Sequence, residues 1–138
     1  MGRIVALDFG LKRTGIAITD EMNIIASGLK TIESNVLIDE LKTLVSNKNV
    51  DTIVIGEPKR LDGTDSHISE NVRILFEHLK KTFPTISIVK YDERFTSKMA
   101  SQTIAMMGFS KSKKQDKSLI DEVSATIILQ SYMQSVGI

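Results

Sequence analysis

Cysteine is absent from the 138-residue sequence, so disulfide bonds and cysteine-based zinc sites are excluded. Histidine is almost as scarce. The separation of His67 and His78 along the sequence matches no common spacing of metal ligands. No convincing Ser-His-Asp or Cys-His set for nucleophilic catalysis stands out either. Any hydrolytic chemistry must therefore depend on other side chains.

Long apolar runs are also missing. None approaches the roughly 18 residues needed to cross a bilayer, and Asp8 interrupts the first apolar stretch too early for a secretion signal. We therefore expect a cytoplasmic protein with no membrane contact. The net charge is +1 and aromatic residues make up only 5%, without an RNP-like cluster. A nucleic-acid partner must then be inferred from local charge patterning.

What the chain does contain suits one globular core. Its 138 residues, 41% hydrophobic and 25% charged, predict a single domain over 1–138, with no repeat or long linker. Three apolar or β-branched stretches come first, at 3–7, 15–19 and 26–32. No helical pattern separates them, which predicts an antiparallel meander.

Helical and strand patterns alternate in the rest of the chain. The periodicities predict helices near 34–45, 69–83, 98–107 and 118–135, and strands at 50–55 and 86–91. Ser34 and Ser69 are candidate helix caps. The expected fold is α/β: a mixed five-stranded sheet, antiparallel through its first three strands and extended by parallel ones, with helices on both faces. The first strand is expected to be central because its apolar run suits burial on both sides.

Carboxylates recur where the predicted strands end. Those acids are Asp8, Glu57, Asp92 and Glu93, and Asp121 heads an apolar row one turn inside the last helix. The ends of parallel strands meet along one edge of an open sheet, where ligands bind. Taken singly, each acid has an ordinary alternative role as a turn former, a solvated group or a helix-dipole partner. Their coincidence at one edge favours a shared site.

Several like charges held close together need either a proton or a divalent cation between them. Magnesium prefers oxygen ligands from few protein groups and keeps positions for water and phosphate. Two such ions can clamp the attacking and leaving oxygens of a phosphodiester. The pattern therefore predicts a nuclease that uses Mg²⁺ (or Mn²⁺) and needs no Ser, Cys or His nucleophile.

Basic residues flank these acids at several places. The ones that we expect to bind nucleic-acid phosphates are Lys12, Arg13, Arg94, Lys111, Lys113 and Lys114. For the lysine run by itself, a solvated loop is the alternative. Backbone and shape recognition is expected in place of base stacking.

The acids lie in four distinctive stretches: ALDFGLKRTGIAITD, IVIGEPKRLDG, YDERFTS and KSLIDEVSATIILQSYM. In this order, over essentially the whole chain, these stretches resemble the YqgF/RuvX family of RNase H-like nucleases. The resemblance implies an RNase H-like fold related to RuvC-type Holliday junction resolvases. It also implies a bacterial role in processing the 5′ end of precursor 16S ribosomal RNA, with Asp8, Glu93 and Asp121 as the catalytic, metal-binding acids.

One position departs from the family pattern. An apolar residue usually stands between the Gly and the Pro of the second stretch, where this chain has Glu57. Glu57 or Asp92 is therefore a candidate for an additional metal ligand, and a surface role for Glu57 is the alternative.

Other functional classes stay open at this point. An Asp-x-Gly hairpin also cradles phosphates in actin-like nucleotide-binding modules, although 138 residues leave no room for their second lobe. A non-catalytic RNA-binding assembly factor is another alternative. Within the nuclease class, structured RNA and branched DNA are both candidate substrates. Both a monomer and a homodimer are compatible with the sequence, and symmetric cutting of a junction on two strands would favour the dimer.

Overall fold

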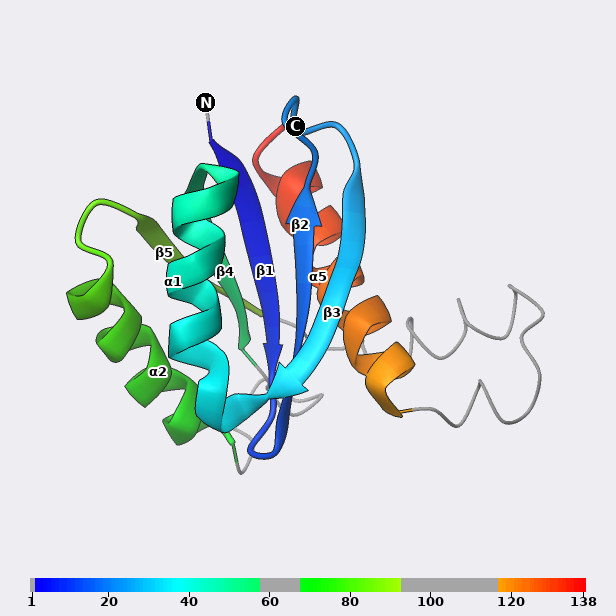
Figure 1. Ribbon diagram of the computed structural model, residues 1–138. Coiled ribbons are helices and arrows are strands. Elements are labelled where there is room, and N and C mark those ends of the chain that lie inside the picture. Colours follow the sequence, from blue (N-terminus) through cyan, green and yellow to red (C-terminus); the bar gives the residue numbers. More distant parts are fainter. Residues whose placement is uncertain (1, 58–67, 93–116) are drawn as a thin grey trace.

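The computed structural model describes residues 2–57, 68–92 and 117–138. Its strands form one sheet in the order β3-β2-β1-β4-β5 (Figure 1). The strands are β1 (Arg3–Phe9), β2 (Arg13–Thr19), β3 (Ala26–Glu33), β4 (Val50–Glu57) and β5 (Ser87–Asp92). The first three pair antiparallel, whereas β4 pairs parallel with both β1 and β5. The predicted mixed five-stranded sheet is confirmed.

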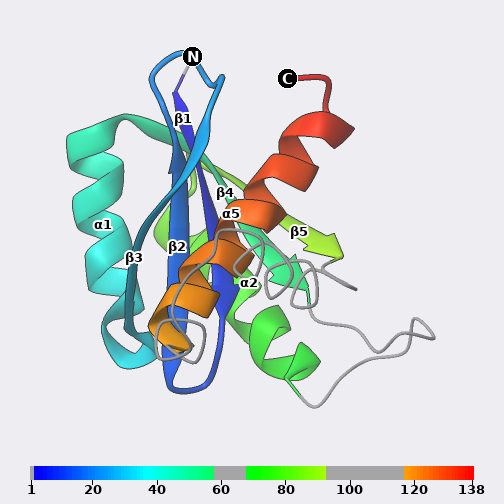
Figure 2. The same ribbon diagram turned by 90° about the vertical axis from the view of Figure 1, so that its right-hand side faces the viewer.

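Helices cover both faces of this sheet, as predicted. They are η1 (Ser34–Val36, a 3-10 turn), α1 (Leu37–Lys48), α2 (Ser69–Thr82) and α5 (Lys117–Ser135). Helices α1 and α2 lie on one face and α5 lies on the other (Figures 1 and 2). No helix in the described ranges is both long and apolar enough to span a bilayer.

Strand β1 is central and buried on both sides, as its apolar run predicts. Val5 and Leu7 belong to the core beneath α1 and α2, whereas Ile4 and Ala6 belong to the core beneath α5. All four are at most 5% exposed. Because successive side chains of a strand point to opposite faces, this alternation tells on which face each later residue of β1 lies.

The same alternation identifies the two faces on the neighbouring strands. On β4, Ile53 and Ile55 pack toward α1 and α2, whereas Val54 packs toward α5. On β2, Ile16 packs toward α1 and α2, whereas Ala17 packs toward α5. Two apolar layers therefore sandwich the sheet, and they assign a face to each polar residue near the strand ends.

Some local predictions are wrong. Ser34 does not cap α1, because a 3-10 turn intervenes and the N-cap residue of α1 is Val36, without a side-chain cap bond. Ser69 lies inside α2, whose N-cap residue is Ile68. Strands β1 and β4 also run two residues further than predicted, to Phe9 and Glu57. The predicted helix at 98–107 lies outside the described residues.

Candidate active site

The carboxyl ends of β1, β4 and β5 meet at one edge of the sheet, and the first turns of α5 lie at the same edge (Figures 1 and 2). This is the edge at which open α/β sheets bind ligands. The predicted acids that the structure describes all lie near it, on two different faces of the sheet.

Asp8 lies on the α5 face. It continues the alternation of Ile4 and Ala6, which pack beneath α5, and it is half-buried. Since β1 extends to Phe9, Asp8 is held inside a paired strand and not in a turn beyond it. Its register partner across the antiparallel β1–β2 ladder is Gly15.

Gly15 allows α5 to approach the sheet next to Asp8. A Cβ atom added at Gly15 would stand 2.1 Å from the carbonyl oxygen of Asp121 and 3.1 Å from its Cβ. No side chain fits in that space, so the helix backbone rests directly on the strand. Directly opposed residues of an antiparallel pair lie about 5 Å apart. Asp8 and Asp121 are therefore neighbours, with no intervening side chain from Gly15.

Asp121 heads the buried row of α5, as predicted. Ala125 and Ile128 on that row are fully buried, and Tyr132 packs against the same core. The Asp121 side chain itself is 22% exposed. An acid at the head of an apolar row is carried to the rim of the core and not into bulk water.

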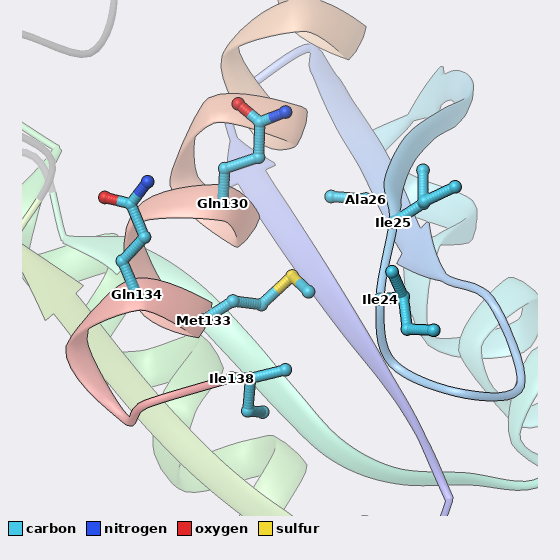
Figure 3. A pocket seen from close by; sticks show the side chains of 7 residues that line it. All are labelled: Ile24, Ile25, Ala26, Gln130, Met133, Gln134 and Ile138. Carbon is cyan, nitrogen blue, oxygen red and sulfur yellow. The ribbon is translucent and has the colours of Figure 1, made fainter.

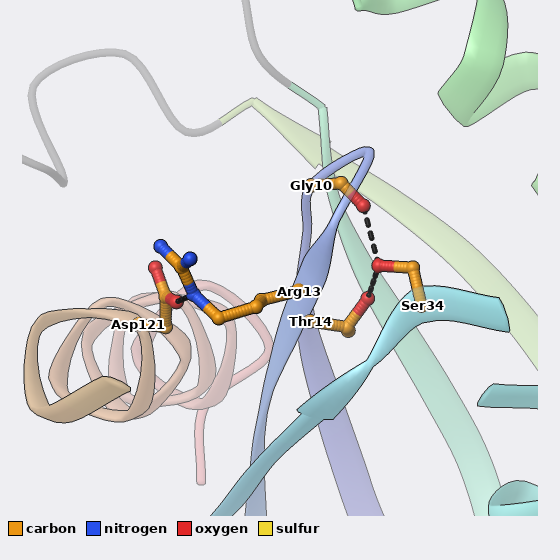
Figure 4. A network of polar contacts seen from close by, with 5 residues as sticks. All are labelled: Gly10, Arg13, Thr14, Ser34 and Asp121. Carbon is orange, nitrogen blue, oxygen red and sulfur yellow. Dashed lines mark hydrogen bonds and ion pairs between the residues drawn. The ribbon is translucent and has the colours of Figure 1, made fainter. Parts of the chain in front are cut away.

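Arg13 contacts Asp121 directly. Its Nε donates a hydrogen bond to Oδ2 of Asp121 at 3.1 Å (Figure 4), and its side chain is 38% exposed. Arg13 is two residues from Gly15 on β2, and so on the same face of the sheet. The predicted phosphate-binding arginine therefore lies at the acids and is an ion-pair partner of one of them.

The β1–β2 hairpin is anchored by Ser34. The Ser34 hydroxyl donates to the Gly10 carbonyl oxygen at 2.5 Å, so the hydroxyl of the buried Thr14 is the donor in the 2.8 Å contact with Ser34 (Figure 4). The Ser34 backbone N–H also donates to the Lys12 carbonyl oxygen at 2.9 Å. These bonds hold the turn that carries Lys12 and Arg13 against the end of β3.

Lys12 is exposed at the tip of this anchored hairpin. It borders a shallow cavity of about 520 Å³ lined by Leu11, Lys12, Arg13, Glu33 and Asn35. Its exposure leaves the side chain in solvent, where a cation can meet a phosphate backbone.

Glu57 lies on the opposite face of the sheet. It continues the alternation of Ile53 and Ile55, which pack toward α1 and α2. Its Oε2 is 3.6 Å from Nζ of Lys90, and that ammonium lies 4.9 Å from the ring centre of Phe76 on α2. The sheet therefore separates Glu57 from Asp8, and this geometry does not favour Glu57 as a ligand beside Asp8.

Asp92 also lies on the face opposite Asp8, as the alternation of side chains along β5 shows. It is exposed at the end of β5 and shares the alternation of Ile88 and Lys90, which places it on the α2 face as well. The structure thus brings Asp8 and Asp121 together and sets Glu57 and Asp92 apart from them.

The remaining predicted site residues lie outside the described residues: Glu93, Arg94, Lys111, Lys113 and Lys114. Within the described ranges, no group of three or more His, Asp or Glu side chains is gathered closely enough to hold a metal ion. Of the three acids that the family resemblance implies, the structure describes Asp8 and Asp121, and Glu93 directly follows β5 in the sequence.

Two residues of this arrangement were not predicted from the sequence as site residues: Gly15 and Ser34. A glycine inside a strand often marks a close approach of another backbone, and Gly15 within RTGIAIT carries that signal. Ser34 carried a polar signal that was read as a helix cap, whereas its hydroxyl bonds to the hairpin instead.

A cavity lined by both apolar and amide side chains lies at the other end of α5 (Figure 3). Its volume is about 440 Å³, and it is lined by Ile24, Ile25, Ala26, Gln130, Met133, Gln134 and Ile138. None of these side chains is charged, so the cavity offers neither a side-chain cation for a phosphate group nor a side-chain carboxylate for a metal ion.

Known proteins match this chain over nearly its entire length. A family described as RuvX, Holliday junction resolvase, matches residues 2–135. A Flavobacterium johnsoniae protein named "putative pre-16S rRNA nuclease" is 50% identical over 135 residues, 98% of each chain. A Porphyromonas gingivalis protein of the same name is 47% identical over 98% of each chain. The solved structure of YeaZ from Pseudomonas aeruginosa covers 78% of this chain and 50% of its own at 15% identity, with a TM-score of 0.47, too distant to carry an inference.

Proposed function

This chain belongs to the RuvX family of Holliday junction resolvases, and we propose that it is a metal-dependent endonuclease that hydrolyses phosphodiester bonds in structured nucleic acid. The names of its relatives make precursor 16S ribosomal RNA the leading substrate, and the resemblance described above implies that the cut is made at the 5′ end. We assign this activity to residues 1–138 as one domain acting in the bacterial cytoplasm.

The observation that carries the proposal is the approach of Asp8 and Asp121 across Gly15. Two half-buried carboxylates that approach each other at a ligand-binding edge can share a cation between them. Their donor atoms are hard carboxylate oxygens, which fit Mg²⁺ or Mn²⁺. Asp8 and Asp121, completed by Glu93, are therefore the residues that would hold the metal.

When bound there, the metal supplies a Lewis acid that activates water and offsets the charge that develops on the phosphate. The protein's own residues position the strand that is cut. Ser34 anchors the hairpin that carries Lys12. Lys12 binds a backbone phosphate near the acids. Arg94, Lys111, Lys113 and Lys114 are proposed to extend this phosphate contact along the strand.

A second candidate substrate is the four-way DNA junction, which the family description favours. Junction cleavage cuts two symmetric strands and so calls for a homodimer, whereas trimming an RNA end needs only a monomer. Cleavage of a precursor 16S rRNA fragment and of a synthetic junction at matched ionic strength, with the oligomeric state measured by light scattering, distinguishes the two.

The test of the site compares acids on the two faces of the sheet. Asp8→Asn keeps the side-chain shape and removes its charge, so the cleavage rate with Mg²⁺ or Mn²⁺ should fall by about 100-fold or more. The matched control is Glu57→Gln, an equal loss of charge on the opposite face, for which we expect a rate within about twofold of wild type. Wild-type cleavage by Asp8→Asn would overturn the proposal, as would loss of activity in both variants.

A further inference from the structure

Arg13 occupies an unusual position for a residue that binds phosphates. In the described chain its Nε already donates to Oδ2 of Asp121, an acid assigned to the metal site. Metal coordination at Asp121 draws on the same carboxylate, and it brings positive charge next to a guanidinium that cannot lose its proton. The arginine and the metal therefore compete for Asp121.

We propose that Arg13 is an exchangeable counter-ion of the metal site. It holds Asp121 while the metal is absent, and it is released to bind a substrate phosphate when the metal is present. This inference rests on the proposed function, because it assumes that Asp121 is a metal ligand. It adds a second state of Arg13 and a coupling between metal and nucleic-acid binding.

The contact has the properties that an exchange requires. Arg13 engages Asp121 through Nε and one carboxylate oxygen, not through the two parallel bonds of a bidentate pair. The pair is also partly solvated, with side-chain exposures of 38% for Arg13 and 22% for Asp121. Exposed single-contact ion pairs are weak, so a divalent cation can displace the arginine without disrupting the fold.

The setting of the hairpin restricts where the released side chain can go. Ser34 anchors the hairpin through the Gly10 and Lys12 carbonyl oxygens, so the backbone at Arg13 stays in place. The guanidinium then swings within reach of the two acids, beside Lys12. A planar guanidinium is suited to bind two oxygens of one phosphate group.

Exchange of this kind makes the two ligands cooperative. The metal frees Arg13 for the nucleic acid, and the nucleic acid removes a competitor of the metal. Removing the Arg13 charge should therefore strengthen metal binding in the absence of substrate. It should also weaken the enhancement of nucleic-acid binding by the metal.

The first test measures Mn²⁺ binding to the full chain by isothermal titration calorimetry without nucleic acid. Arg13→Gln should bind Mn²⁺ about two- to fivefold more tightly than wild type, the range expected for removing a weak ion pair. Lys12→Gln is the matched control, since it removes an equal charge from the adjacent residue, which is exposed at the hairpin tip. It should change the Mn²⁺ affinity less than Arg13→Gln does.

The outcomes separate this inference from the proposed function. If wild type binds Mn²⁺ and Asp121→Asn does not, the metal site stands. Equal or weaker binding by Arg13→Gln would then overturn the exchange alone, because a purely positioning arginine would lower the affinity when removed. If wild type itself binds no Mn²⁺, the proposed metal site fails as well.

The second test measures the coupling. The probe is a nuclease-resistant phosphorothioate oligonucleotide with the precursor 16S rRNA sequence, and its binding is followed by fluorescence anisotropy with and without Mn²⁺. We expect Mn²⁺ to tighten binding to wild type more than to Arg13→Gln, with Lys12→Gln weakened equally in both conditions. The same Mn²⁺ enhancement in wild type and Arg13→Gln would contradict the exchange.

Discussion

The two faces of the sheet carry similar charges at the same edge but use them differently. On the α2 face, the Glu57 carboxylate lies 3.6 Å from the Lys90 ammonium, which rests over the Phe76 ring. On the α5 face, Asp8 and Asp121 lie close together beside Arg13, and Gly15 leaves the space between them without a side chain. The first arrangement pairs Glu57 with a packed cation, whereas the second brings two acids together where the backbone of α5 rests on Gly15.

This difference explains how one edge can contain both a structural contact and a site. An acid matched by a packed lysine is electrostatically satisfied within the fold and has little affinity to offer a metal. Asp8 and Asp121, beside the partly exposed Arg13, offer carboxylate oxygens of the kind that a divalent cation binds. The function is therefore expected on the α5 face, although both faces carry predicted acids.

The largest expected effect comes from adding a side chain where the backbone of α5 rests on Gly15. Gly15→Ala would place a Cβ 2.1 Å from the Asp121 carbonyl oxygen, which is backbone and cannot rotate away. We expect the helix to shift, the free energy of unfolding to fall by about 2–4 kcal/mol and nuclease activity to be lost. Denaturant unfolding and a cleavage assay measure the two effects.

Gly28→Ala is the matched control for that change. Gly28 also faces α5, but the nearest atom to an added Cβ is the Thr126 side-chain oxygen at 3.3 Å, which needs to move only slightly. Its activity should stay close to wild type. If both glycine variants lost activity and stability equally, the hypothesis that the close approach of α5 at Gly15 is specifically required would be wrong.

A smaller effect is expected on the α2 face. Lys90→Met removes the cation between Glu57 and Phe76 while keeping an apolar stem of similar length. The free energy of unfolding should fall by about 1 kcal/mol or less, and the cleavage rate should stay within about twofold of wild type. Lys80→Met is the control, because Lys80 also lies over Phe76, at 4.8 Å, and forms an ion pair with Glu77 in place of Glu57. Loss of activity in Lys90→Met alone would show that the α2 face takes part in catalysis.

The smallest effect is expected at the end of the sheet far from the site. Asp20 accepts backbone N–H bonds from Ile25 and Ile24, at 2.8 and 2.7 Å, and these lower its pKa below the ordinary value of 3.8. A lowered pKa in the folded state adds stability above pH 3.8, and this contribution is lost as the pH falls through the folded pKa. Asp20→Asn should therefore be slightly less stable than wild type at pH 7, with the difference shrinking below pH 3.8.

Denaturant unfolding across that pH range measures the Asp20 effect, and cleavage at pH 7 should be unchanged by the variant. A difference in stability that grows as the pH falls would have the wrong sign for a lowered pKa.

Much of the fold was predictable because its signals are local. The apolar run of β1 predicted a strand buried on both faces, and the row from Asp121 to Tyr132 predicted which side of α5 packs on the sheet. The strand limits were less predictable. The apolar patterns predict strands that stop at Leu7 and Ile55, before Asp8 and Glu57, yet ladder pairing carries both strands through these acids.

The site was predictable in part for the same reason. The sequence predicted that Asp8 ends the first strand, that Asp121 lies one turn inside the last helix and that Arg13 flanks a candidate acid. It did not identify the face on which Glu57 and Asp92 lie, the contact between Arg13 and Asp121, or the anchoring role of Ser34. Each of these depends on contacts between residues that are distant in the chain.

The sequence by itself determined the order of strands and helices, the apolar faces that each must bury, and the set of acids and cations available for chemistry. Those properties follow from spacing along one chain. Only the tertiary structure decided which acids share a face, because a side chain's face depends on the exact extent and register of its strand. It also decided that Gly15 brings Asp8 and Asp121 together. The missing Cβ has this effect only because the backbone of α5 packs into the place that a side chain would fill.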